Sequence, residues 1–178
     1  MIGDLISKSI NEVEELWKDK SSSQQPSTSP AEPMPQGIPT LKKGIYRESS
    51  PMLTERYELL GRWTRATHGS WLSLLDMEEL WKETPPDDLL NRISLNRMAA
   101  EENWPNDVAA LFRPERLSLF AGSDNGNERI YLLWLDFVDE PELWAYDSNG
   151  ESRYKNLEDY LKAFLKDDLS ASTRSWRA

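Results

Sequence analysis

The stretch from Arg129 to Phe137 constrains the fold more than any other part of the chain. It is the most apolar run in the sequence, and its apolar residues follow one another without regular alternation. A strand with one face in water alternates apolar and polar residues, whereas a continuous apolar run needs cover on both faces. We therefore predict that this run is a central strand of a sheet.

Further strands are predicted on either side of this run. An apolar segment at 117–122 precedes it, and the turn sequence Ser-Asp-Asn-Gly at 123–126 joins the two. An aromatic segment at 143–146 follows, and Asp-Ser-Asn-Gly at 147–150 is a strong hairpin signal before a short strand at 153–154. The pattern predicts an antiparallel meander.

An amphipathic helix closes this meander. Asn156 suits the N-cap, Glu158 and Asp159 lie near the positive end of the helix dipole, and Lys162 and Lys166 lie towards its negative end. Five apolar residues recur at helical spacing and share one face: Leu157, Tyr160, Leu161, Phe164 and Leu165.

The first forty residues divide into a helix and an arm. Residues 1–20 carry one apolar stripe at helical spacing, which consists of Ile2, Leu5, Ile6, Ile10, Val13, Leu16 and Trp17. Residues 21–40 are rich in Ser, Gln and Pro, and their prolines oppose regular structure, so we interpret them as a linker or an extended arm. Docking of the first helix onto the domain and a mobile tail stay open as alternatives.

The middle of the chain indicates mainly helices. Apolar residues at three- and four-residue steps predict a helix over 53–66, a short apolar run predicts a strand over 71–75, and a third helix runs from about 88 to 101 or 102. Helices, then strands, then one helix are typical of the α+β class. We expect a mainly antiparallel sheet of about four to six strands, with helices packed on one face, in a domain over 41–168 that is followed by a tail at 169–178.

The composition excludes several classes of partner and site. With 31 acidic and 21 basic residues the net charge is -10, whereas a nucleic-acid interface needs clustered Lys and Arg. No apolar run approaches the roughly 18 residues of a membrane span, and the first residues are too polar for a signal peptide. There is no cysteine. We expect a cytoplasmic protein with no nucleic-acid or membrane partner, and its acidity fits either a solvated surface or a site for a basic partner.

The sequence shows no specific catalytic or metal-binding motif. His68, the only histidine, ends a predicted helix, and we interpret it as a cap or loop residue. The turn at 122–126 has two glycines but lacks the lysine and the following helix of a phosphate loop. The acidic cluster at 136–142 lacks the ligand spacing of a calcium loop. We therefore expect a protein that is not an enzyme, with no catalytic residue, no metal and no cofactor.

The remaining signal is a set of aromatic residues interleaved with carboxylates. Single tryptophans such as Trp134 and Trp144 are more typical of a core than of a contact surface. An aromatic side chain that stays exposed beside carboxylates is typical of a hot spot that binds a cationic protein surface. The set lies on adjacent predicted strands and turns and consists of Trp134, Asp136, Trp144, Tyr146, Asp147 and Tyr154.

These segments follow a recognisable order. In the second half, Phe-Arg-Pro at 112–114 precedes an apolar strand with Leu-Phe-Ala at 119–121, a glycine turn follows, and the next strand ends in Leu-Asp at 135–136. Leu-Trp-Ala-Tyr-Asp at 143–147 then precedes the closing helix. In the first half, the helical segment at 55–60 leads to His-Gly-Ser, and a short strand with an acidic helical stretch follows. The chain from about Leu53 to Leu165 thus resembles the SUKH superfamily of α+β domains, many of which are bacterial immunity proteins.

The resemblance implies a non-enzymatic immunity protein that binds and neutralises a cognate bacterial toxin domain, for which a nuclease is one candidate. An acidic, aromatic surface would occlude the toxin stoichiometrically, and the charge of this chain indicates a basic partner surface. The alternative is an interaction adaptor that recruits partners through the first helix and the Pro-rich arm. The candidate partner-binding residues are Asp124, Glu128, Asp136, Asp139, Glu140, Trp144 and Asp147.

Overall fold

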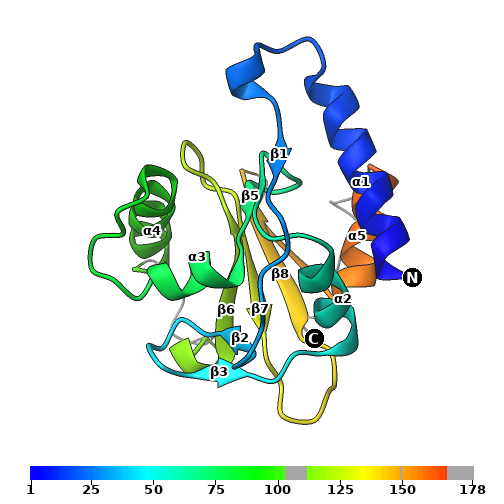
Figure 1. Ribbon diagram of the computed structural model, residues 1–178. Helices are drawn as coiled ribbons and strands as arrows, with labels where there is room; N and C mark the ends of the chain where they lie inside the picture. Colours follow the sequence, from blue (N-terminus) through cyan, green and yellow to red (C-terminus); the bar gives the residue numbers. More distant parts are fainter. Residues whose placement is uncertain (103–111, 149, 168–178) are drawn as a thin grey trace.

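A seven-stranded antiparallel sheet runs through the middle of the protein (Figure 1). The computed structural model describes residues 1–102, 112–148 and 150–167, so the predicted tail at 169–178 lies outside the described residues. A separate two-stranded sheet pairs β2 (Ile38–Pro39) with β3 (Tyr46–Arg47). The main sheet has the order β1 (Ser27–Thr28), β4 (Trp63–Thr64), β5 (Ser70–Trp71), β6 (Leu117–Gly122), β7 (Arg129–Leu133), β8 (Glu142–Asp147) and β9 (Gly150–Tyr154).

Helices make up the rest of the regular structure and confirm the predicted α+β class with a closing C-terminal helix. The sheet has more strands than the four to six we expected, because β1, β4 and β5 are two-residue strands, too short to show an alternating pattern. Within the described residues the α-helices are α1 (Ile2–Trp17), α2 (Pro51–Leu59), α3 (Leu74–Glu79), α4 (Asp88–Glu101) and α5 (Leu157–Leu165).

The helices lie on both faces of the sheet, and the expectation that they pack on one face is wrong. In Figure 1, α3 and α4 lie on one side of the sheet and α1, α2 and α5 on the other. Tyr131 faces α4, where its hydroxyl donates to Glu101 over 2.9 Å. The next residue, Leu132, points the other way, in the same row as Tyr154, whose ring centre lies 5.1 Å from that of Tyr160 in α5. Tyr131 and Leu132 are both fully buried, as the continuous apolar run of β7 predicts.

The first helix and the arm pack against the rest of the chain. The apolar stripe of α1 contacts α5 and α2, and Ile6 and Val13 are buried there. The arm then crosses the edge of the sheet, where β1 pairs with β4, and it carries β2 further on. Of the two alternatives for the first helix, the structure has the docked one, and the arm contains short strands between its prolines.

The helix predicted over 53–66 is too long. α2 ends at Leu59 because the buried guanidinium of Arg56 donates to the backbone oxygens of Leu60, Gly61 and Leu72. These bonds hold the chain extended after the helix, and the short strand β4 follows. The strand predicted over 71–75 is likewise mostly wrong, since β5 ends at Trp71 and α3 soon begins.

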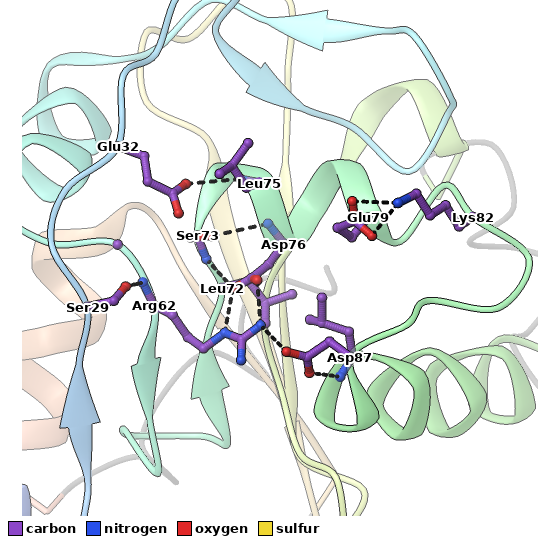
Figure 2. Close-up of polar contacts among 12 residues, drawn as sticks. Ser29, Glu32, Arg62, Leu72, Ser73, Leu75, Asp76, Glu79, Lys82 and Asp87 are labelled. Carbon is purple, nitrogen blue, oxygen red and sulfur yellow. Dashed lines mark hydrogen bonds and ion pairs between the residues drawn. The ribbon is translucent and has the colours of Figure 1, made fainter.

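Arg62 joins the arm to α3 and α4 (Figure 2). Its backbone N–H donates to the Ser29 hydroxyl, and its guanidinium donates to Asp76 and Asp87. Asp76 forms a capping box with Ser73 at the start of α3, and Asp87 is the N-cap of α4. One guanidinium thus binds the carboxylates at the starts of both α3 and α4.

Candidate protein-interaction site

The predicted partner-binding residues do not form one surface. The meander reverses at each turn, so Asp124, Glu128 and Asp147 lie at one end of the sheet, whereas Asp136, Asp139 and Glu140 lie in the loop at the other end. Figure 1 shows the β6–β7 turn at the top and the β7–β8 loop at the bottom. At a rise of about 3.3 Å per residue, strands of this length separate the two groups by roughly 15 to 20 Å.

Trp144 is a core residue, which corrects its prediction as a contact residue. It is 2% exposed. Its indole packs edge-on against the Phe112 ring at 4.6 Å, and the Arg153 guanidinium lies 3.9 Å from its ring centre. The indole N–H donates to the Glu142 carboxylate over 3.0 Å. The side chain therefore offers no surface to a partner.

At the β6–β7 end, two of the three predicted carboxylates have partners within the chain. Asp124 lies 3.8 Å from Arg92, and Asp147 lies 3.4 Å from Nε2 of His68. Asp124 and Glu128 also line a groove of about 250 Å³ together with Trp17 of α1. This groove has a mixed lining of apolar, acidic and basic side chains, and none of its residues is a largely exposed aromatic.

His68 is part of a buried polar chain at this end of the sheet. It lies in the turn between β4 and β5, as a loop residue should, but it is buried and its Nδ1 lies 2.7 Å from the Tyr160 hydroxyl. That hydroxyl lies 2.5 Å from the Thr67 hydroxyl, which accepts the indole N–H of Trp71. Burial raises the pKa of Tyr160 well above its ordinary value. These contacts link α5 to the β4–β5 turn.

The β7–β8 loop carries an exposed aromatic residue beside carboxylates. Phe137 is 86% exposed and Val138 is 44% exposed, while Asp136 and Asp139 flank this pair and are exposed as well. Large apolar side chains of this kind mark interaction sites when they gather on a protein surface. This loop, residues 134–141, has the exposed aromatic beside carboxylates that is typical of a hot spot.

Phe137 is not among the predicted binding residues because the predicted strand includes it. β7 ends at Leu133, and the chain then turns, with the Val138 N–H within 3.4 Å of the Leu135 oxygen. The available signal was the apolar pair at 137–138 between Asp136 and the Asp-Glu-Pro that follows. Acidic residues on both sides of an apolar pair, ahead of a proline, are more typical of a loop than of a buried strand.

The loop is held at both of its ends. The Trp134 backbone N–H donates to the Arg116 oxygen over 2.9 Å. Asp136 accepts a hydrogen bond from Arg116 over 3.0 Å and lies 3.5 Å from Arg47. Glu140 accepts the Met52 backbone N–H in the first turn of α2 over 2.9 Å. The tip with Phe137 therefore projects from an anchored base.

These bonds change the expected roles of the three loop carboxylates. Asp136 lies between two arginines, so its charge is largely compensated. Glu140 satisfies a helix N-terminus and acts mainly within the fold. Asp139 has neither an ion pair nor a hydrogen bond to any described residue, and its carboxylate is free for a partner.

A cleft of about 610 Å³ lies next to this loop. One segment that lines it runs from Arg47 to Pro51, ahead of and into α2, and the other belongs to the β7–β8 loop and consists of Trp134, Leu135, Asp136, Val138 and Asp139. In the part of the chain that the structure describes, no three histidine or carboxylate side chains gather as a group that would hold a metal ion. No helix there combines the length and apolar character that crossing a bilayer requires.

Comparison with known proteins adds no relative, because no family model, no curated protein and no solved structure matches the chain. The resemblance to the SUKH superfamily stays a prediction from the motifs of the sequence.

Proposed function

We propose that this protein is a stoichiometric inhibitor that binds a cognate bacterial toxin domain in the cytoplasm through its β7–β8 loop. The resemblance to SUKH immunity proteins is the reason for proposing a toxin as the partner. The observation that carries the proposal is the exposure of Phe137 on an anchored loop, because the free-energy change is favourable when a partner covers an apolar ring that lies in water.

The size of this gain is sufficient for a hot spot. Full burial of a Phe side chain contributes about 1.5–3 kcal/mol. Because Glu140 and Asp136 already hold the base of the loop, less conformational entropy is lost on binding than for an unanchored loop. Val138 and Phe137 together supply an apolar centre with a polar rim, the usual anatomy of a protein interface.

The charge of the chain fits a basic partner. The net charge is -10, and the carboxylate of Asp139 is exposed beside Phe137. Such a field speeds the association of a protein with a basic surface, such as the active-site groove of a nuclease. In this proposal the protein performs no chemistry and acts by covering the toxin.

The adaptor alternative has less support. It needs the apolar stripe of α1 to bind a partner, but most of this stripe packs against α5 and α2, and Leu16 is its one largely exposed member. Recruitment through α1 would require undocking of the helix and exposure of Ile6 and Val13. We therefore favour the inhibitor.

The test is a pull-down of tagged full-length protein from its native cells, with retained polypeptides identified by mass spectrometry. We expect the wild-type chain to retain one toxin-like polypeptide at near equal stoichiometry, and Phe137→Ala to lose it. Leu95→Ala removes a similarly exposed apolar side chain from α4 and should keep the partner. Equal retention by Phe137→Ala would exclude the loop as the contact, and an absence of any stoichiometric partner would exclude the inhibitor.

A further inference from the structure

The cleft beside the β7–β8 loop has the size and lining of a ligand site. Its volume of about 610 Å³ falls within the range of about 300–1,000 Å³ typical of small-ligand sites, so the cleft has room for a side chain of a partner. Trp134, Leu135, Val138 and Pro51 supply apolar lining, and the polar groups come from both segments. Its position next to Phe137 places it at the edge of the proposed contact surface.

Ser50, which lines this cleft, carries a buried hydroxyl with an unused hydrogen-bonding capacity. The residue is 4% exposed, and its Oγ has no hydrogen-bond partner among the described residues. Buried polar atoms are nearly always paired, and each exception calls for an explanation such as an absent ligand. Ser50 is the N-cap of α2, yet its side chain caps nothing.

The start of α2 withholds two backbone positions from capping by the Ser50 side chain. Pro51 at the first helical position has no N–H, and the Met52 N–H donates to the Glu140 carboxylate. That carboxylate also compensates the positive end of the helix dipole, so the helix start does not repel a cation in the cleft.

Of the charged groups that line the cleft, some have partners within the chain and others have none among the described residues. Arg47 donates to the backbone oxygen of Glu115 over 3.0 Å and pairs with Asp136. Glu48 and Asp139, one from each lining segment, have no ion pair or hydrogen bond to any described residue. The cleft is thus lined by residues that carry two carboxylates and one buried hydroxyl without a partner among the described residues, beside apolar side chains.

We infer that this cleft receives an arginine side chain of the partner. A guanidinium has five N–H donors and no acceptor, which suits the carboxylates of Glu48 and Asp139 and the oxygen of Ser50, and its methylenes suit the apolar lining. The inference rests on the proposed function, since the partner supplies the arginine. It adds that the partner surface presents an arginine next to the apolar site that covers Phe137.

The test uses N-acetyl-arginine-N-methylamide as the probe and the amide signals of full-length protein by NMR. We expect saturable shifts at Ser50, Val138 and Asp139, and no such shifts with the matching citrulline compound, which has the same shape but no charge. Absent or unsaturable shifts, or equal shifts with citrulline, would overturn the inference.

Single substitutions show where on the protein the arginine probe binds. Asp139→Asn should weaken probe binding about fivefold, because a charge-assisted hydrogen bond is lost. Asp124→Asn makes the same change at the other end of the sheet and should leave probe binding unaltered. Ser50→Ala removes an oxygen that has no partner among the described residues, and it should weaken binding about twofold. Equal affinities for Asp139→Asn and Asp124→Asn would place the probe outside the cleft.

The probe titration and the pull-down can fail independently, so the test of the arginine site is distinct from the test of the proposed function. Phe137→Ala should abolish retention of the partner but leave the probe affinity unchanged, because Phe137 does not line the cleft. If the probe fails to bind while Phe137→Ala still loses the partner, the arginine site is wrong and the inhibitor stands. If the probe binds as expected and no partner is retained, the inhibitor is wrong and only the chemistry of the cleft stands.

Discussion

Arg62 donates two hydrogen bonds to the carboxylate of Asp76, at 2.9 and 2.6 Å. The side chain of Asp76 is buried, and the side chain of Arg62 is mostly buried. The hydrogen bond to Asp76 is the main reason that the pKa of the Arg62 guanidinium lies above its ordinary value. Since the same guanidinium reaches Asp87 over 3.1 Å, this contact joins the start of α3 to that of α4.

The first prediction concerns the removal of this guanidinium. Arg62→Ala should lower the free energy of unfolding by roughly 3 kcal/mol, because it leaves the buried Asp76 without its ion-pair partner. Arg92→Ala removes an arginine that is largely exposed and should cost less than about 1 kcal/mol. Denaturant unfolding followed by tryptophan fluorescence gives both values, and similar losses for the two variants would contradict the role of Arg62.

The second prediction concerns the fall in the free energy of unfolding at acidic pH. Burial alone would raise the pKa of Asp87, but the hydrogen bonds from Leu90 and Arg62 outweigh it and the pKa lies below the ordinary value. The unfolded chain therefore binds a proton at higher pH than the folded one, and the stabilisation by Asp87 is present above about pH 4 and lost as the pH falls through the folded pKa. Denaturant unfolding across the range in which carboxylates titrate, roughly pH 2.5 to about pH 6, should show this fall in stability, and Asp87→Asn should make it smaller. An equal fall in the variant would show that other carboxylates account for it.

The third prediction concerns the fall in the free energy of unfolding at alkaline pH. Burial raises the pKa of Tyr57 to about 12, and its hydroxyl faces the Met77 sulfur at 3.9 Å. Because the unfolded pKa is about 10, the contribution of Tyr57 is complete below that pH and is lost as the pH rises towards the folded value, by about 2 to 3 kcal/mol in all. Tyr57→Phe has no group to titrate, so its stability should fall less over this range. Parallel curves for the two proteins would contradict the prediction.

The fourth prediction compares two serines at helix starts. Ser73 accepts the Asp76 N–H in a capping box, whereas Ser50 precedes α2 without capping it. Ser73→Ala should therefore lower the free energy of unfolding by about 1 kcal/mol. Ser50→Ala should leave it unchanged or raise it, because it removes a buried hydroxyl that has no partner among the described residues. A loss at Ser50 equal to that at Ser73 would mean that Ser50 acts in folding and would weaken its assignment to a ligand site.

Local patterns in the sequence determine much of this fold. The helix predicted from the spacing of Leu157 to Leu165 has those bounds, and the strands around the turns at 123–126 and 147–150 lie where the turn residues indicate. These features depend on residues close together in the chain, so periodicity and turn chemistry report them directly. The cover on both faces of β7 followed from its unbroken apolar run, although the single-sided packing that we expected for the helices did not agree with it.

Tertiary contacts decided what the sequence left open or misplaced. Arg56 ends α2 through carbonyls that reach as far along the chain as Leu72, and no local pattern records such a bond. The alternation of strand directions sends Asp124 and Asp139 to opposite ends of the sheet, although both occur in the same acidic part of the sequence. Burial of Trp144 and exposure of Phe137 depend on where β7 stops and on which helices cover its two faces. Local composition determines which elements form, whereas solvent access to a given side chain is set by distant segments that pack over it.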